Sequence, residues 1–178
     1  MDVFAHSLYG ITVCSKTGLA GGRAGSGKKR FIEDSTLWIA GLFSLLPDMI
    51  SMWLPFLLFL FGDRQDNFFH EFTDKNIVLY RYMHSLVISL GVFGLIAVIR
   101  RSWAIPALAW SVHVICDSVT HDAGKFRTTL FYPFTDWGFD GFAFWIDLRA
   151  LIVYWSVLPV VWILLCRYRR TSNSTVSL

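Results

Sequence analysis

The sequence predicts an all-α protein, a polytopic membrane helical bundle with four to five transmembrane segments. Its 178 residues are 54% hydrophobic and only 16% charged, whereas soluble domains carry about a quarter charged residues. The apolar residues also form runs long enough to cross a hydrocarbon core, which takes about 20 helical residues. The length suits one domain. We therefore expect a single membrane-embedded domain over residues 1–170 and a disordered C-terminal tail over residues 171–178.

Four apolar segments are expected to cross the membrane as helices. They are residues 37–61, 80–99, 103–119 and 142–166. Pro47 and Pro55 interrupt the first of them, and a proline inside a helix predicts a kink. The N-terminal segment, residues 2–20, is rich in small residues and has a short apolar part, so it crosses in one interpretation and not in the other. The two interpretations give five and four spans.

Clusters of basic residues predict the orientation in the membrane. Residues 28–30, 100–101 and 167–170 carry these clusters at alternate ends of successive spans. By the positive-inside rule all three lie in the cytoplasm, and so does the C-terminus. The loops 62–79 and 120–141 then face outward from an inner or plasma membrane. The net charge of +3 lies in short clusters rather than on one amphipathic face, so membrane lipids and not nucleic acids are the expected partners.

One apolar helical run carries two metal-binding residue types at a suitable spacing. His113 and Asp117 are four residues apart, which places them on one helix face with Cβ atoms about 5–6 Å apart. The predicted topology brings His84 to the same outer leaflet, and His6 joins it if the first segment crosses. Asp48 lies in mid-span at a proline, where a kink can carry it to the same cavity. These five residues are therefore candidate metal ligands.

The type and number of these donor atoms indicate which metal the site would bind and how many ions it would hold. A charge near the bilayer centre costs about 2.5–3.5 kcal/mol on insertion scales, so Asp48 should have a partner or face a water-filled cavity. Five donors exceed the three protein ligands of an ordinary catalytic zinc, so either two metals share the site or some donors support the ligands. The three widely spaced cysteines form no thiolate motif. We expect one or two divalent ions, zinc first, with manganese or iron as alternatives.

Other polar residues have simpler interpretations. His70 and His121 lie among polar residues of predicted loops and are expected at the solvated surface. Asp147 and Arg149 open the last span and are expected to form an interfacial pair or gate.

For Asp48 the alternative to a ligand is a polar cap at a kinked helix end, and for the histidines it is a hydrogen bond to a backbone carbonyl.

The order of these motifs resembles a known family. The relevant stretches are His6 in its small-residue segment, Leu46-Pro47-Asp48, Tyr80-Arg81-Tyr82-Met83-His84-Ser85-Leu86, His113-Val114-Ile115-Cys116-Asp117 and Tyr132-Pro133-Phe134. Together they resemble the YdjM-like family of membrane-bound, metal-dependent hydrolases over residues 6 to about 134. The resemblance implies a helical membrane protein distantly similar to the zinc-dependent phospholipase C superfamily, with a catalytic metal cluster held by His6, Asp48, His84, His113 and Asp117.

The chain departs from the family pattern at three positions. Many relatives have a second acid where this chain has Ile50. Tyr80 stands where a histidine is frequent, and Tyr82 where a glycine is common. Two potential ligands are therefore missing from the pattern.

These observations favour a membrane-bound, metal-dependent hydrolase that acts on a phosphoester or other ester of a lipid or lipid-linked substrate through metal-activated water. Asp117 or Asp48, whichever is not a ligand, is the candidate acceptor of the water proton. Arg81 is the nearest candidate to neutralise a phosphate oxygen. Two alternatives use the same residues: an ion or proton transporter, and a membrane interaction protein whose catalytic site has degenerated.

Overall fold

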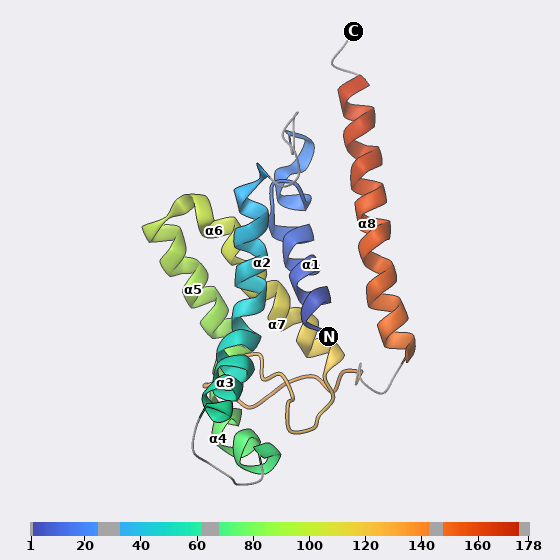
Figure 1. Cartoon of the computed structure of the whole chain (residues 1–178). Helices are drawn as coiled ribbons and strands as arrows, with labels where there is room; N and C mark the ends of the chain where they lie inside the picture. Colours follow the sequence, from blue (N-terminus) through green and yellow to red (C-terminus); the bar gives the residue numbers. More distant parts are fainter. Residues whose placement is uncertain (1, 25–32, 62–67, 143–147, 175–178) are drawn as a thin grey trace.

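The computed structural model describes residues 2–24, 33–61, 68–142 and 148–174, and all the regular structure in these ranges is helical (Figure 1). The α-helices are α1 (Val3–Cys14), α2 (Ser35–Asp48), α3 (Leu54–Leu60), α4 (Phe68–Met83), α5 (Leu86–Ile99), α6 (Arg101–Ala107), α7 (Ala109–Thr120) and α8 (Leu148–Ser174). A 3₁₀-helix, η1 (Leu19–Ala24), follows α1, and a π-helical turn, η3 (Met49–Trp53), joins α2 to α3. The prediction of an all-α fold is confirmed.

Two to three parts of the described chain are candidate membrane spans by length and composition. Ser35–Leu58 and Leu148–Arg169 are each long and apolar enough to cross. Asn76–Met83 and Leu86–Ile99 qualify together, as a pair bent by 57°. The predicted span 103–119 is divided between the short helices α6 and α7, and α1 has only 12 residues. The count of four to five spans therefore remains a prediction.

Several predicted boundaries differ from the structure. Helix α4 begins at Phe68, inside the expected outer loop 62–79. Polar composition suggested that loop, but charged residues such as glutamate and lysine are good helix formers. The last helix begins at Leu148 and continues to Ser174. Residues 171–174 of the expected disordered tail are therefore helical, since no proline or glycine stops the helix there. Residues 175–178 lie outside the described part of the chain.

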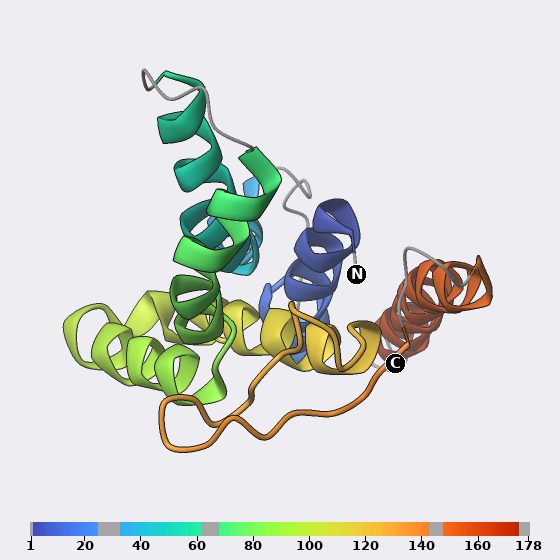
Figure 2. The ribbon, with the colours of Figure 1, turned by 90° about the horizontal axis from the view of Figure 1, so that it is seen from below.

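Helix α1 is at the centre of the arrangement. It packs against α2, α7 and α8, and α2 packs in turn against α6 and α7. Figure 1 shows that the start of α1 and the ends of α2 and α7 lie toward the same end of the bundle, and that the segment after α7 runs across this end. Seen from below, α5 and α8 lie at opposite margins (Figure 2). Three chain segments distant in sequence thus meet at one end.

Small residues allow α1 to approach its neighbours closely. A Cβ atom added at Gly10 would lie 2.6 Å from Ser44 Cβ and 3.0 Å from Ala109 Cβ, on α2 and α7 respectively. Ala5 and Ala40 are fully buried. Such small-residue contacts are typical of helix packing in membranes. They place His6, one turn before Gly10, against the two partner helices.

Hydrogen bonds at Asp34 join the segment after α1 to the start of α2. Thr36 donates to Asp34 Oδ1 from its backbone nitrogen at 3.0 Å and its hydroxyl at 2.6 Å. Thr17 donates to Oδ2 from the same two groups, at 2.8 and 2.7 Å. Partial burial would raise the pKa of Asp34, but the hydrogen bonds from Thr36 and Thr17 outweigh it and hold the pKa below its ordinary value of 3.8. The ionised carboxylate is therefore part of this helix junction.

The Asp34→Ala variant should unfold more easily than the wild type at neutral pH. An N-cap of this kind contributes about 1 kcal/mol. Because the pKa of Asp34 is lower in the folded state, its contribution is present above the ordinary value of 3.8 and is lost as the pH falls through the lower folded-state value. The difference in Tm between variant and wild type, measured by circular dichroism in detergent, should therefore shrink below about pH 4. A difference that is constant with pH would contradict the assignment.

Candidate metal centre

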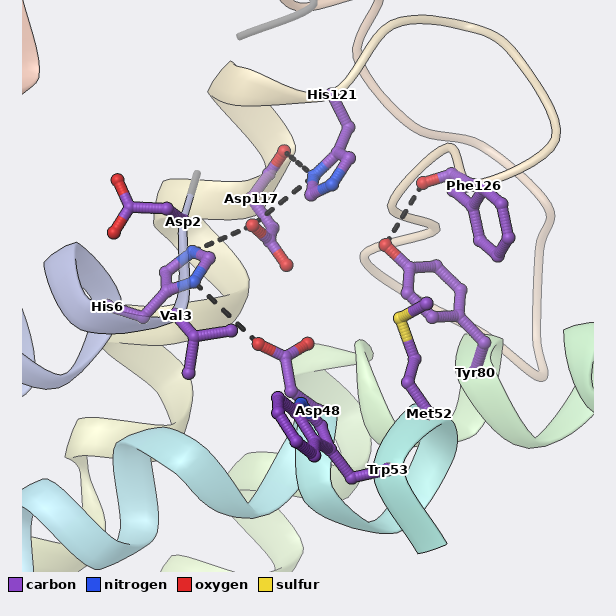
Figure 3. A pocket seen from close by; sticks show the side chains of 10 residues that line it. All are labelled: Asp2, Val3, His6, Asp48, Met52, Trp53, Tyr80, Asp117, His121 and Phe126. Atoms are coloured by element: carbon purple, nitrogen blue, oxygen red, sulfur yellow. Dashed lines mark hydrogen bonds and ion pairs between the residues drawn. The ribbon is translucent and has the colours of Figure 1, made fainter. Parts of the chain in front are cut away.

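The structure brings all five predicted ligands together. His6 lies on α1, Asp48 is the last residue of α2, His84 directly follows α4, and His113 and Asp117 lie on α7. The three histidines and Asp117 are at most 1% exposed, and Asp48 is 9% exposed. Figure 3 shows Asp48 and Asp117 pointing toward His6 from opposite sides. Residues that span most of the chain thus converge on one buried point.

An irregular helix end places Asp48. Pro47 lacks a backbone N–H, so it cannot donate the regular helical hydrogen bond. Directly after Asp48 the chain widens into the π-helical turn η3, where Ser51 donates its hydroxyl to the carbonyl oxygen of Pro47 at 2.7 Å. Such π-helical turns are rare in proteins, and those that occur are often found at functional sites. The expected kink at Pro47 therefore takes the form of a π turn beside the candidate ligand.

A helix break places His84. The chain bends between α4 and α5, and Ser85 caps α5. The hydroxyl of Ser85 donates to the carbonyl oxygen of Tyr132 at 2.7 Å, and the indole nitrogen of Trp110 donates to that of Met83 at 2.8 Å. The segment around Tyr132, which carries part of the family-like pattern, therefore supports the bend rather than supplying ligands.

Backbone carbonyls determine which nitrogen of two histidines carries the proton. His84 Nδ1 lies 3.0 Å from the carbonyl oxygen of Tyr80, and His113 Nδ1 lies 2.7 Å from that of Ser44. A carbonyl oxygen can only accept, so each Nδ1 is the donor and each Nε2 of the neutral rings presents a lone pair. The two Nε2 atoms lie 3.2 Å apart.

These two nitrogens share one space with two carboxylates. His84 Nε2 lies 3.2 Å from Asp48 Oδ1 and 3.4 Å from Asp117 Oδ2. His113 Nε2 lies 3.2 Å from Asp117 Oδ2 and 3.7 Å from Asp48 Oδ1. Two ligands of a tetrahedral zinc with bonds of 2.0–2.1 Å are about 3.3 Å apart. The donor atoms of all four residues lie within 4.8 Å of one another, so the group can hold a metal ion.

Charge gives a second reason for a cation at this place. Two carboxylates and two imidazole lone pairs face one another in a buried space, and with neutral rings none of the four groups brings a proton to it. Uncompensated buried charges cost several kcal/mol each. A divalent cation bound by all four would remove this cost, and its ligands are held in place by hydrogen bonds from the far side of each ring.

His6 approaches the carboxylates from another side. Its Nε2 lies 2.7 Å from Asp117 Oδ1, and its Nδ1 lies 3.9 Å from Asp48 Oδ2. Neither ring nitrogen has a hydrogen-bond partner of regular geometry among the described residues. The ring lies against that of His113, with centroids 3.9 Å apart. His6 therefore lies close to the group of four. It faces the two carboxylate oxygens that do not face His84 and His113.

The expectation that His121 lies at the solvated surface is wrong. Its side chain is 11% exposed, and Nδ1 lies 3.2 Å from Asp117 Oδ1 and 3.1 Å from the Asp117 carbonyl oxygen. The sequence carried a signal for this contact, because His113, Asp117 and His121 are spaced i, i+4 and i+8, which is one helix face. The polar residues around His121 outweighed that spacing in the sequence-based interpretation.

Two positions at which the chain departs from the family-like pattern, Tyr80 and Ile50, have different surroundings. Tyr80 is buried, stacks on His84 with ring centroids 3.9 Å apart, and donates its hydroxyl to the carbonyl oxygen of Phe126 at 3.0 Å. Ile50 packs against the apolar core. Tyr80 therefore forms a wall of the site, and Ile50 stabilises the bundle.

The remaining predicted residues lie elsewhere. Arg81 pairs with Asp136 at 3.2 Å and its side chain is 36% exposed, so its role at a phosphate stays a prediction. Arg149 lies exposed in the first turn of α8, while Asp147, its expected partner, is outside the described residues. His70 lies in the first turn of α4, and its side chain is outside the described part of the chain.

A cavity of about 400 Å³ lies against this centre (Figure 3). Its polar lining residues are Asp2, His6, Asp48, Tyr80, Asp117 and His121. Its apolar lining residues are Val3, Met52, Trp53 and Phe126. The cavity therefore joins a candidate metal centre to a surface suited to hydrocarbon.

No protein-family model, curated protein or solved structure matches the chain. The functional argument therefore depends on the geometry of its own residues.

The His113→Ala and Asp117→Ala variants should lose the metal. Wild-type protein purified in detergent without chelators should retain stoichiometric divalent metal in elemental analysis, and each variant should bind it more than about 100-fold more weakly, since even residues that only support ligands contribute 10- to 100-fold. Asp140→Asn is the control, because Asp140 lies at the exposed surface and accepts a hydrogen bond from the Ala123 nitrogen. Wild-type protein without metal would contradict the centre.

Removal of the metal should also destabilise the fold. A ligand present at 100 times its Kd stabilises the folded state by about 2.7 kcal/mol. Addition of a chelator should therefore lower the Tm of the wild type by several degrees, and should leave that of His113→Ala unchanged. Equal Tm values of wild-type protein with and without the chelator would exclude a tightly bound structural or catalytic ion.

Proposed function

We propose that this protein is a membrane-embedded, metal-dependent hydrolase that cleaves a phosphoester or other ester bond of a lipid or lipid-linked substrate. The observation that supports the proposal best is the buried group Asp48, His84, His113 and Asp117, which offers four metal-ligand atoms and lies beside an amphipathic cavity. The order of motifs that resembles the YdjM-like family supports the same function.

The donor set suits hydrolysis. A divalent ion held there would lower the pKa of a coordinated water from about 15.7 toward 7 and polarise the ester or phosphoryl oxygen. The carbonyls behind the rings of His84 and His113 hold the Nε2 atoms toward the space that the ion would occupy. The carboxylate of Asp48 or Asp117 could accept the proton of the attacking water, so that hydroxide adds to the carbonyl carbon or phosphorus. The same proton would then pass to the departing alkoxide, which leaves as the alcohol.

The apolar residues that line the cavity support a lipid-like substrate. Trp53, 54% exposed, lies both at the cavity and at the outer surface of the bundle. The adjoining helix α3 also exposes large apolar side chains, among them Leu58 at 67%. Exposed apolar surface of this kind marks contact with lipid or partners. A substrate with a hydrocarbon chain can therefore lie against these apolar side chains while its polar end reaches the carboxylates.

The ends of the bundle support the proposed orientation. Arg169 of α8 donates to the carbonyl oxygens of Thr17 and Gly18, just beyond the end of α1, whereas His6 lies in the first turns of α1. The turn between α5 and α6, which contains Arg100, lies toward the Arg169 end in Figure 1. With these arginines in the cytoplasm, the centre faces the extracytoplasmic leaflet of an inner or plasma membrane, and α1 and α6–α7 complete four to five spans.

Reporter fusions should test this orientation. A reporter inserted between residues 62 and 67 should be active only as an extracytoplasmic fusion, and one placed after Arg170 only as a cytoplasmic fusion. The positive-inside rule predicts this pair because the arginine-rich ends lie in the cytoplasm. A cytoplasmic reporter between residues 62 and 67 would overturn the outer-leaflet placement while leaving the metal centre unaffected.

Hydrolysis itself should depend on Asp117. Zinc-loaded wild-type protein in mixed micelles should release phosphate ester or fatty acid from a panel of phospholipids, and Asp117→Asn should reduce the rate by roughly 10²–10⁴-fold. Asp140→Asn serves again as the control. Metal that binds and crosses liposome membranes without turnover of any lipid would favour the transporter, and metal binding with neither activity would favour a degenerate interaction protein.

A further inference from the structure

The segment that follows α7 exposes aromatic side chains at one end of the bundle. Residues 131–142 contain six aromatic residues and no leucine, isoleucine, valine or methionine. Five of the six side chains are 45% to 81% exposed, and we call these five rings the aromatic platform: Phe131, Phe134, Trp137, Phe139 and Phe142. Exposed apolar surface of this kind marks a site of contact with a membrane or a protein.

The main chain under the platform is tied to the rest of the bundle at both ends. The hydroxyl of Ser85 donates to the carbonyl oxygen of Tyr132 at 2.7 Å, and the backbone nitrogen of Phe142 donates to that of Val119 at 2.8 Å. Between these points a Cβ atom added at Gly138 would overlap a neighbouring main-chain carbonyl. The rings are therefore displayed from a closely packed backbone.

The rings also order one another. Trp137 stacks on Phe131 with ring centroids 6.1 Å apart, and it meets Phe139 edge to face with centroids 4.8 Å apart. Aromatic pairs at these separations attract each other beyond the effect of the area that they bury. The platform is thus a surface with a defined shape.

The platform combines rings with charges, and the boundary of a membrane suits both. Asp136 pairs with Arg81 at 3.2 Å, and Asp140 accepts a hydrogen bond from the Ala123 nitrogen at 2.8 Å. Ionised groups are costly in the hydrocarbon core, whereas exposed rings are unfavourable in water. Tryptophan is enriched at membrane–water interfaces, and together with phenylalanine it forms the apolar face of segments that lie there.

The place of the platform in the bundle agrees with this depth. The segment after α7 runs across the end at which the candidate span Leu148–Arg169 begins (Figure 1). The exposed side chains along that span are mostly aliphatic, among them Val153, Val160 and Leu164. Surface that faces hydrocarbon thus gives way to aromatic surface where the span begins, which is the level of the headgroups.

We propose that the aromatic platform binds phospholipid at the membrane interface, with its rings between the headgroups and the hydrocarbon. The inference rests on the membrane embedding in the proposed function and goes beyond it, because contact of the rings with lipid requires neither metal nor hydrolysis. The proposed orientation places this interface in the outer leaflet. Phe126, earlier in the same segment, lines the cavity. The platform therefore fixes the cavity at the depth where lipid ester groups lie.

Spin labels test this depth in phosphatidylcholine vesicles. Phe134→Cys and Phe139→Cys, made in a Cys116→Ala, Cys166→Ser background that leaves the buried Cys14, each carry one label. A label at Val160, exposed on α8, gives the hydrocarbon reference, and one at Ser172, beyond the arginine cluster, gives the aqueous reference. Collision rates with oxygen, which partitions into lipid, and with a water-soluble nickel complex should give both platform labels a ratio several-fold above that of Ser172 and below that of Val160.

Three results would overturn the platform. Ratios equal to that of Ser172 would place the rings in water, and ratios equal to that of Val160 would place them in the hydrocarbon core. Immobilised labels that neither reagent reaches would show that a protein partner or a second copy covers the rings. Each of these results, combined with metal-dependent lipid hydrolysis, would leave the proposed function intact. An aqueous ratio at Val160 would overturn both.

Brominated lipids supply a measurement on the unlabelled protein. The emission present in the wild type and absent from Trp137→Phe belongs to Trp137, and phenylalanine preserves an aromatic ring at this position. Bromine near the headgroup end of the acyl chains should quench this difference more strongly than bromine near the chain ends. Equal emission with brominated and ordinary lipids would contradict contact of Trp137 with the membrane.

Discussion

The structure depends on the electrostatic balance of one buried point. Two carboxylates, from Asp48 and Asp117, face the Nε2 nitrogens of His84 and His113 at 3.2–3.7 Å. Such a set is unstable in a low-dielectric interior unless a cation joins it. The close packing of the helices that carry these residues therefore requires compensation of the charge at their meeting point, and one divalent metal ion bound by the four residues would supply it.

Two irregular parts of the fold position the side chains of this buried group. The π turn after Asp48 and the bend at His84 each interrupt a candidate span, and each is stabilised by a serine hydroxyl that donates to a backbone carbonyl. An unbroken helix would leave no free end to direct these side chains at one another. Backbone carbonyls behind the rings of His84 and His113 then select the tautomer. The scaffold thus orients ligands through its own main chain.

The surroundings of the centre connect its chemistry to the membrane. The cavity is lined by carboxylates and imidazoles and by the apolar side chains of Val3, Met52, Trp53 and Phe126. A soluble ester would gain little from these apolar side chains, whereas a lipid chain would be desolvated by them.

The sequence by itself determined the features that are local. Its composition predicted an all-α membrane protein, and the spacing of His113 and Asp117 predicted a shared helix face. The tertiary structure decided the rest. His121 continues that face, but only the fold shows that its ring is turned inward. The contact of the Ser44 carbonyl with His113, and the close approach of His6 beside Gly10, join residues from different helices. Periodicity encodes a helix face, whereas the meeting of faces depends on long-range packing.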